Sequence, residues 1–444
     1  MTKCLPFGEY KHNTDIKAYT LWRIITIYKM TRMKKTLLTM IVFCPAMMSA
    51  QTFDFDMTED IGAYNDTVGY GYDILPVPDG KSAAPFYFSV KVPDGNYTVA
   101  VVLGSKKKKS STTVRAESRR LLLEDVALDK GKTAQYEFVV NKRSPKIDDK
   151  ESVKIKDREK GSLTWDDKLT LEFNGDAPAV KSIHIARNDS CPTIYLCGNS
   201  TVVDQGSEPW ASWGQMFPRW FDSGVAISNH AESGLTAGSF IAQKRLDKIM
   251  STLKAGDLVV CEFGHNDEKE KGPGSGAYYH YSRNLKIFID NVRSKGADIV
   301  FCTPTQRRRF DDSKTTITDT HGDFPAAMKA VAERENVPLV DLHAMTKTFF
   351  ETLGYEDSKH ALVHYAAGTF PDQEKALADN THFNPYGAYE VAKMVVMGFK
   401  QLNLPAGKHL REDFTDFDPA APDDWKTFKW HLSGMTDLLK PDGN

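Results

Sequence analysis

The chain has 444 residues, more than one ordinary domain, so two or three domains are expected. Hydrophobic residues make up 41% of the sequence and charged residues 26%, which is typical of globular proteins and excludes a disordered or fibrous chain. The formal net charge of −2 gives no general attraction to nucleic acid, so no nucleic-acid partner is expected.

Residues 33–50 have the parts of a secretory signal peptide in the right order. Two lysines precede the apolar run Leu37–Phe43, and Ser49 and Ala50 are small residues suited to cleavage. The run is too short to span a bilayer. We therefore expect residues 1–50 to be a signal peptide with a mis-assigned upstream extension. The protein is then exported to the periplasm, the cell surface or the medium, without integral membrane association. A membrane anchor or a lipoprotein are the alternatives.

Residues 51–190 are predicted to form a β-sandwich accessory domain. Short runs with period-two patterning, such as FYFSVKV (86–92) and YTVAVVL (97–103), alternate with turn residues. Two charged stretches, 106–109 and 141–162, are expected to be solvent-exposed loops. The strand count and turns resemble galactose-binding-like domains, which implies carbohydrate binding; a structural cover for the next domain is the alternative.

Residues 191–410 are predicted to form an α/β domain, followed by a tail over 411–444 that packs back on one of the domains. Strand-like apolar runs alternate with helical stretches, as expected for a parallel sheet covered by helices on both faces. The expected strands are 193–198, 224–231, 258–264, 299–305 and 337–343. The expected helices lie near 211–221, 238–254, 282–295, 325–335 and 385–402.

Four cysteines, at positions 191, 197, 261 and 302, lie in this predicted domain. Three of them sit in apolar strand-like runs, which favours buried free thiols. A disulfide between two of them is permitted in an oxidising compartment. No C-x-x-C pair indicates zinc.

Active sites of such sheets lie beyond the carboxyl ends of the strands, which directs attention to the residues that follow each strand. Ser200 follows Gly198 at the end of the first strand, where a tight turn exposes it. A serine nucleophile needs a base within hydrogen-bond reach. A helix N-cap serine is the alternative.

Donors for a developing oxyanion follow the next two strands. Gly234 can present an unobstructed backbone N–H, and Asn266 can present its amide. With the N–H of Ser200 they would form an oxyanion hole of three donors. An ordinary turn residue is the alternative for Asn266.

Asp379 and His382 stand in a loop directly before the helix predicted from Pro385. An aspartate three residues before a histidine can hold one ring nitrogen and fix the tautomer, as in a Ser-His-Asp triad. Metal ligation is the rival interpretation, but no second histidine lies nearby at ligand spacing. We therefore expect no metal and no organic cofactor.

The sequence over about residues 192–405 resembles the SGNH (GDSL-type) hydrolases, most closely their rhamnogalacturonan acetylesterase branch. The runs that carry the resemblance are TIYLCGNSTVVD, WGQMF, FGHND and DNTHFNPYGA. The four marker residues of that family would be Ser200, Gly234, Asn266 and His382. The resemblance implies a three-layer α/β/α, flavodoxin-like fold and removal of acetyl groups from pectic polysaccharide. Asn199 departs from the aspartate usual in the family; it keeps the hydrogen-bonding shape and loses the charge.

The predicted function is thus an exported carbohydrate acetylesterase acting on an acetylated polysaccharide or oligosaccharide through an acetyl-enzyme. Two rivals are a lipase or thioesterase on the same scaffold and a non-catalytic glycan-binding protein with a relic site. A lipid enzyme should have a broad apolar approach to the serine, and the polar surroundings of Ser200 in the sequence speak against it.

Weaker candidates could contact substrate. Arg307, with the two arginines after it, could meet galacturonate carboxylates, and a solvated loop is the alternative. His265 could contact substrate or orient the Asn266 loop. Trp213, like Trp210, could stack on a sugar ring, and a place in the core is the alternative. His343 is expected to end a strand.

Overall fold

The computed structural model describes residues 52–78, 84–434, 438 and 440–442. The predicted signal peptide and upstream extension lie outside the described residues. Within the described part of the chain, no helix is both long enough and apolar enough to cross a bilayer.

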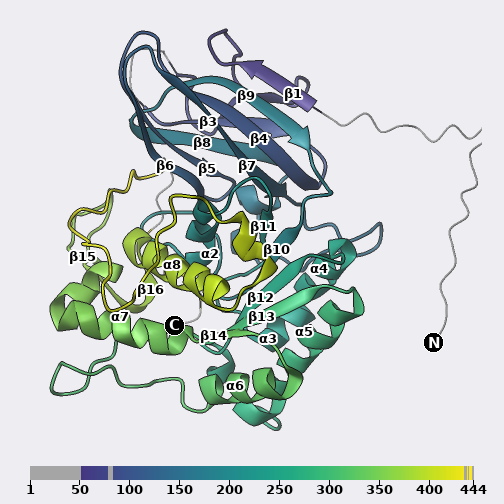
Figure 1. The fold of residues 1–444 in the computed structure, drawn as a ribbon, viewed down its shortest axis with the longest axis vertical. Coiled ribbons are helices and arrows are strands. Elements are labelled where there is room, and N and C mark those ends of the chain that lie inside the picture. The colour runs from purple at the N-terminus through teal and green to yellow at the C-terminus, as the bar shows by residue number, and fades with distance from the viewer. Residues whose placement is uncertain (1–51, 79–83, 435–437, 439, 443–444) are drawn as a thin grey trace, which may run out of the picture. The chain divides into compact units, whose positions relative to one another are not determined.

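Two antiparallel sheets form the N-terminal part of the described chain (Figure 1). Their strand orders are β1-β9-β4-β7 and β2-β3-β8-β5-β6. The strands are β1 (Thr52–Asp56), β2 (Tyr70–Asp73), β3 (Phe86–Lys91), β4 (Gly95–Gly104), β5 (Ser110–Ala116), β6 (Arg120–Leu128), β7 (Thr133–Lys142), β8 (Lys168–Ala177) and β9 (Val180–Arg187). Val99 and Ile185 of the first sheet share one buried core with Phe88 and Leu171 of the second, so the sheets pack face to face as a sandwich. Its likeness to galactose-binding-like domains stays a prediction.

The charged stretch 141–162 is largely solvent-exposed, as its composition predicts, but not all of its charged residues follow that expectation. Arg143 and Glu159 are buried. Glu159 forms an ion pair with Arg245, and Arg143 donates a hydrogen bond to the carbonyl of Asn229. These partners lie in the second half of the chain, so the charges are satisfied across a junction that composition cannot reveal. The lysines at 106–109 are exposed, as expected.

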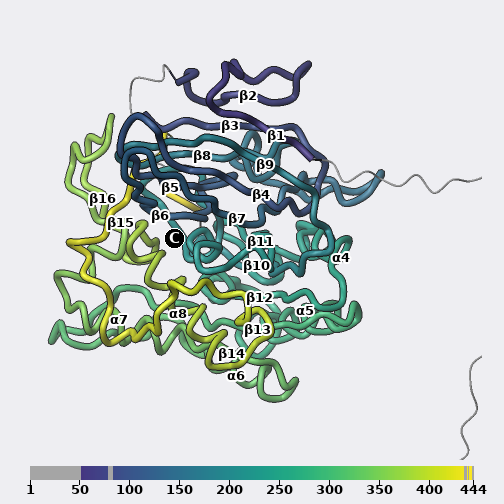
Figure 2. The backbone as a smooth tube through the Cα atoms, turned by 45° about the horizontal axis from the view of Figure 1, so that its top comes forward, coloured from purple at the N-terminus to yellow at the C-terminus, as the bar shows by residue number. Residues whose placement is uncertain are grey.

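A parallel sheet of five strands organises the second part of the described chain, which confirms the predicted α/β class. Its order is β11-β10-β12-β13-β14, and Figure 2 shows the strands following one another in that order. They are β10 (Thr193–Gly198), β11 (Ala226–Asn229), β12 (Leu258–Glu262), β13 (Asp298–Cys302) and β14 (Leu339–Val340). From β10 the chain goes to β11 on one side and then crosses to β12 on the other, so a topological switch point lies between β10 and β12.

Helices cover both faces of this sheet. They are α2 (Trp213–Met216), α3 (Ala237–Ala242), α4 (Arg245–Thr252), α5 (Ser282–Ser294), α6 (Phe324–Glu335), α7 (Leu342–Asp357) and α8 (Pro385–Gln401). Alternate residues of β10 enter different cores: Leu196 packs in a cluster with residues of α2, α7 and α8, whereas Cys197 packs with residues of α3, α4, α5 and α6. The continuous apolar runs of the sequence are therefore strands buried on both sides.

Three elements differ from their sequence predictions. The strand expected at 337–343 is cut to two residues, because Asp341 caps a helix by accepting a hydrogen bond from the N–H of Ala344. His343 therefore lies in the first turn of α7. The helix expected over 238–254 is two helices, with Lys244 between them in a left-handed conformation at φ 62°. The helix expected at 211–221 ends at Met216 and continues as a 3₁₀ turn over Phe217–Trp220.

All four cysteines of the α/β part are buried free thiols, so the disulfide alternative is not realised. The tail after α8 packs on both parts of the described chain. The ring of Trp430 lies 4.0 Å from the guanidinium carbon of Arg115 in the sandwich, and Phe428 packs against Tyr386 of α8.

A buried ion pair joins three regions of the chain. Arg119, in the turn between β5 and β6, lies 2.6 Å from Glu208, and both side chains are buried. The same arginine donates to the carbonyl of Trp210 at 2.9 Å, and Trp430 of the tail donates to Glu208 at 2.9 Å. The sandwich, the α/β part and the tail therefore meet at the carboxylate of Glu208.

Replacing this arginine should destabilise the fold strongly. In Arg119→Met, Glu208 would keep a buried charge without its cation, and we expect the free energy of unfolding to fall by about 3–5 kcal/mol in urea titrations. The double variant with Glu208→Gln should recover part of the loss. Arg334→Met, which removes an exposed arginine, is the matched control and should change stability by less than about 1 kcal/mol. Equal stability of Arg119→Met and the unmodified protein would contradict this role.

Candidate active site

The residues predicted to carry chemistry follow three neighbouring strands of the sheet. Ser200 comes after β10, Gly234 after β11 and Asn266 after β12. The carboxyl ends of parallel strands meet at one edge of a sheet, so the three positions share the edge at the switch point.

Ser200, His382 and Asp379 form a continuous chain of hydrogen bonds. The Nε2 atom of His382 lies 2.9 Å from the Oγ of Ser200, and its Nδ1 lies 2.8 Å from a carboxylate oxygen of Asp379. All three side chains are buried. Since an ionised carboxylate only accepts hydrogen bonds, Nδ1 carries the proton, and Nε2 is left as the acceptor for the serine hydroxyl.

Asp379 is held in its ionised form. Burial alone would raise its pKa, but the hydrogen bond with His382 and those from the backbone N–H groups of His382 and Thr381 hold the pKa of Asp379 well below its usual range. The carboxylate can therefore orient the imidazole over the whole range of pH in which the protein would work.

Asp379 and His382 lie in a strand and not in the predicted loop. The strand is β16 (Leu377–Phe383), paired antiparallel with β15 (Leu362–Tyr365). The first strand of this hairpin comes from a stretch without a clear strand signal in the sequence. Asn384 then caps α8 by accepting from the N–H of Gly387, which fixes the residues just before it.

The two further oxyanion candidates, Gly234 and Asn266, lie in adjoining loops. Gly234 has a φ of 77°, a left-handed conformation that favours glycine. The amide of Asn266 donates one hydrogen bond to the carbonyl of Leu235 at 3.1 Å, which ties it to the loop of Gly234. An amide carries two N–H donors, and this bond engages one of them.

Asn199 shapes the turn that carries Ser200. Its Oδ1 accepts a hydrogen bond from the N–H of Thr201 at 3.1 Å, whereas its Nδ2 is buried and has no hydrogen-bond partner among the described residues. The carbonyl of Ser200 in turn accepts from the hydroxyl of Ser212 at 2.6 Å. The turn is held by the side-chain oxygen of residue 199, which an asparagine supplies as well as an aspartate.

Trp213 is not a sugar-stacking residue, because it is fully buried. Its indole N–H donates to Glu262 at 2.6 Å, and the hydroxyl of Thr201 donates to the other oxygen of that carboxylate at 2.8 Å. Glu262 thereby links the end of β12 to the turn of the nucleophile. The sequence alone gives this glutamate no role, and its one signal is a carboxylate inside an apolar run.

His265 and Arg307 lie together beside Asn266. His265 is buried, and burial together with the charges of His321 and Arg307 lowers its pKa well below the usual value, so it is neutral. Arg307 forms an ion pair with Glu268 at 2.6 Å and donates to the carbonyl of His265 at 3.2 Å. Arg307 is thus a partly buried, paired group and not a solvated one.

The C-terminal segment lies over the candidate site. Lys440 is 3.3 Å from the carboxylate of Asp379, and Asp442 forms an ion pair with Lys156 at 3.0 Å. A Cβ atom at Gly234 would stand 2.8 Å from the Cβ of Asp442. The sequence predicts that the tail packs on a domain, but not that it reaches this edge of the sheet.

In the described part of the chain, no group of three His, Cys, Asp or Glu side chains is arranged to hold a metal ion. His382 instead uses both ring nitrogens for Ser200 and Asp379.

Glu262 should make stability depend on pH. Burial raises its pKa to about 7 from an ordinary 4.5, so the folded protein holds this proton more tightly than the unfolded chain. Stability therefore falls as pH rises from about 4.5 to 7. Glu262→Gln keeps the shape and removes the titration. The loss of unfolding free energy between pH 5 and pH 8 should then be smaller by about 2.5 kcal/mol. An unchanged pH dependence in urea unfolding would refute this assignment.

Comparison with known proteins agrees with the geometry of the site. The sequence pattern of the GDSL-like lipase/acylhydrolase family matches residues 196–388. Rhamnogalacturonan acetylesterase RhgT of Bacillus subtilis is 42% identical over 219 residues, covering 49% of this chain and 93% of that protein. The rhamnogalacturonan acetylesterase of Emericella nidulans is 30% identical over 236 residues, covering 48% and 87%.

Among solved structures, the YXIM protein of Bacillus subtilis aligns over 80% of this chain and 100% of its own, at 22% identity and a TM-score of 0.46. The matched sequence region holds Ser200, Gly234, Asn266 and His382. The chain belongs to the GDSL-like lipase/acylhydrolase family and is a serine ester hydrolase.

Proposed function

We propose that the protein is an exported carbohydrate esterase that removes acetyl groups from a pectic polysaccharide of the rhamnogalacturonan type. The observation that carries the proposal is the hydrogen-bonded chain Ser200–His382–Asp379 at the carboxyl edge of the sheet. The substrate class is supported by the names of relatives at 42% and 30% identity, both rhamnogalacturonan acetylesterases. Export is proposed from the signal-like sequence at 33–50.

The reaction begins when the Nε2 of His382 takes the proton of Ser200 as the serine oxygen attacks the acetyl carbonyl. A tetrahedral intermediate forms, and its oxygen carries a negative charge. Collapse of the intermediate breaks the bond to the sugar oxygen, which leaves with the proton from His382. Water then attacks the acetyl-serine, again giving a proton to His382, and acetate and free Ser200 are released.

The tetrahedral oxygen would be stabilised by the N–H groups of Ser200 and Gly234 and by the second amide hydrogen of Asn266. Asp379 remains ionised throughout and stabilises the imidazolium that forms at each proton transfer. The buried carboxylate thus acts through charge and orientation and does not itself take the proton.

The surroundings of the serine favour a carbohydrate over a lipid substrate. Side chains that contact the site from the tail and the neighbouring loops include Lys156, Asp442 and Lys440, all of them charged. A lipase or thioesterase would need an apolar approach for its acyl chain. The alternative of a glycan-binding protein with a relic site is disfavoured by the unbroken chain of hydrogen bonds from serine to carboxylate.

Removing the nucleophile should abolish the activity. We expect Ser200→Ala to lower the rate of acetate release from acetylated rhamnogalacturonan by about 10⁴-fold or more, because no acetyl-enzyme can form. Ser190→Ala, at an exposed serine before β10, is the matched control and should retain full activity. Acetylated xylan and a long-chain ester serve as comparison substrates. Near-normal turnover by folded Ser200→Ala, or a preference for the long-chain ester, would overturn the proposal.

The oxyanion role of Asn266 predicts a specific kinetic pattern. Asn266→Ala should lower kcat by about 100- to 1000-fold with little change in KM, because the lost hydrogen bond forms only in the transition state. Steady-state kinetics on a small acetyl ester measure both constants. A change confined to KM would show that the amide binds substrate and does not stabilise the oxyanion.

A further inference from the structure

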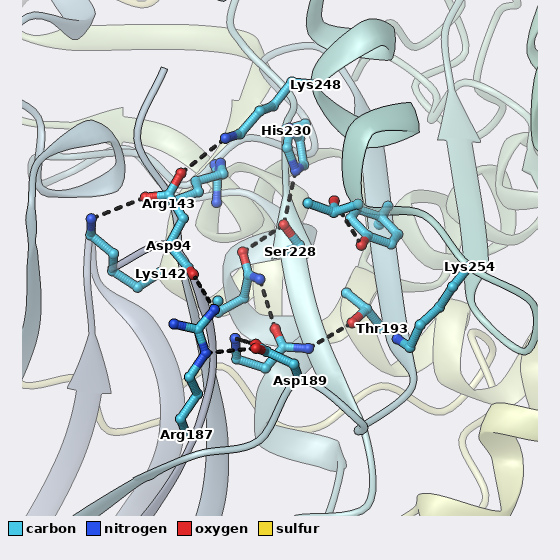
Figure 3. A pocket seen from close by; sticks show the side chains of 15 residues that line it. Asp94, Lys142, Arg143, Arg187, Asp189, Thr193, Ser228, His230, Lys248 and Lys254 are labelled. Atoms are coloured by element: carbon cyan, nitrogen blue, oxygen red, sulfur yellow. Dashed lines mark hydrogen bonds and ion pairs between the residues drawn. The ribbon is translucent and has the colours of Figure 1, made fainter. Parts of the chain in front are cut away.

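A cavity of about 330 Å³ lies where the sandwich meets the α/β part (Figure 3), and none of Ser200, Asp379 and His382 lines it. Its lining comes from strands β4, β7 and β9 on one side and from β10, β11 and α4 on the other. Thr193, one of the lining residues, begins β10, whereas Ser200 follows its end. The length of a six-residue strand, roughly 17 Å, separates the two positions.

The lining carries more positive than negative charge. Five cationic side chains and two carboxylates line the cavity, namely Lys142, Arg143, Arg187, Lys248 and Lys254 with Asp94 and Asp189. Asp94 is shared between Lys142 at 3.1 Å and Lys248 at 2.9 Å. Figure 3 shows these side chains around one hollow. Lys254 also pairs with Asp257 at 2.9 Å and Arg187 with Asp189 at 2.6 Å, and both of these cations are partly exposed. The buried surplus therefore lies at Lys142, Arg143 and Lys248, which have one lining carboxylate, Asp94, among them. Such a surplus is costly unless an anion compensates it.

Arg143 is the least compensated of these cations. It is buried, and its Nε and Nη1 atoms have no hydrogen-bond partner among the described residues. Its remaining contacts are the carbonyl of Asn229 and the ring of Trp165, 4.5 Å from the guanidinium carbon. An arginine offers five N–H donors in a planar fork that matches a carboxylate.

A chain of neutral polar groups crosses the same cavity. Asn96 donates to Thr193 at 2.8 Å and accepts from Asn141 at 2.7 Å, and Ser228 donates to Asn141 at 2.7 Å. The hydroxyl oxygen of Ser228 lies 2.9 Å from the Nε2 of His230. Amide and hydroxyl groups of this kind are suited to the hydroxyls of a sugar.

The tautomer of His230 follows from this chain. The hydroxyl proton of Ser228 goes to Asn141, so Nε2 of His230 must supply the hydrogen in the next bond. Its Nδ1 is then an acceptor, buried and without a hydrogen-bond partner in the described structure. The lining thus combines unused donors on Arg143 with an unused acceptor on His230.

We propose that this cavity is a second carbohydrate site, which binds a hexuronate residue. The carboxylate lies toward Arg143 and Lys248, and the sugar hydroxyls meet the chain from Asn96 to His230. Among small anions, the choice of a uronate rests on the proposed function, since a galacturonan polymer carries one carboxylate on each uronate. The site would hold the polymer by a group that the ester chemistry leaves untouched.

The test is calorimetric titration of the full chain carrying Ser200→Ala. Galacturonate and a short oligogalacturonate should bind, neutral galactose should bind at least about tenfold more weakly, and inorganic phosphate should not displace the uronate at equal concentration. Equal binding of galactose would overturn the role of the cations. Displacement by phosphate would reduce the cavity to a general anion site and overturn the uronate assignment.

Variants then locate the binding. Arg143→Met should weaken galacturonate binding by about tenfold or more, as expected for a lost charge-assisted hydrogen bond. If this buried change prevents folding, the double variant Arg187→Gln, Lys254→Gln serves instead, because both side chains are partly exposed at the cavity. Lys295→Gln, at an exposed lysine outside the lining, is the matched control and should bind like the parent. Unchanged binding in folded cavity variants would place the uronate elsewhere and refute the proposal.

Because binding is measured without turnover, the two proposals can fail separately. Uronate binding to the cavity together with no acetate release by the serine-containing protein would refute the activity and leave the site. Acetate release by the serine-containing protein, together with cavity variants that bind uronate normally, would refute the cavity site and leave the activity.

Discussion

The hydrogen bond between Ser200 and His382 joins residues 182 positions apart in the sequence, and the chemistry of the site depends on it. The serine follows strand β10 of the parallel sheet, whereas the histidine belongs to the β15–β16 hairpin outside that sheet. Phe383, the next residue, accepts a hydrogen bond at its carbonyl from the N–H of Ala211, on the segment that follows the serine turn. The hairpin is therefore fastened to the serine side of the site by backbone as well as by side chains.

The sandwich is bound to the α/β part through buried polar groups. Arg119 with Glu208 and Glu159 with Arg245 are ion pairs with little or no exposure. Such pairs stabilise only when both partners are in place, so they specify one arrangement of the two parts more than they add to stability. The arginine of the first pair also holds the carbonyl of Trp210, whose ring packs edge-on at 5.7 Å from that of His382. The sandwich thereby reaches His382 through one intermediate residue.

Local signals in the sequence suffice for the sheet and for the residues at its carboxyl edge. Apolar runs ending in Gly198 or Gly264 mark strands and the turns after them. The order of Ser200, Gly234, Asn266 and His382 along the chain then indicates the candidate site. Local sequence does not predict burial where the partner of a charged residue is distant in the chain. Glu159 is charged and would be expected at the surface, yet it pairs with Arg245, 86 positions away.

The sequence also fails where one residue outweighs a pattern. The run VPLVDLH is largely apolar, like a buried strand, but Asp341 caps a helix inside it, so α7 could not be predicted from the apolar run. Trp213 illustrates a third limit, since an indole at a helix start suits a sugar or a core equally, and only the buried carboxylate of Glu262 decides between them.

The most direct test of the account is to trap the acetyl-enzyme. Rapid acid quenching during turnover of an acetylated substrate, followed by mass spectrometry of the digested protein, should find one acetyl group on the peptide that contains Ser200. In Asp379→Asn we expect hydrolysis of the acetyl-enzyme to slow more than its formation. The acetylated fraction of Ser200 should therefore be higher in this variant than in the unmodified protein. Acetate release with the acetyl group on another residue, or with acetylation of the same peptide persisting in Ser200→Ala, would contradict the central claim.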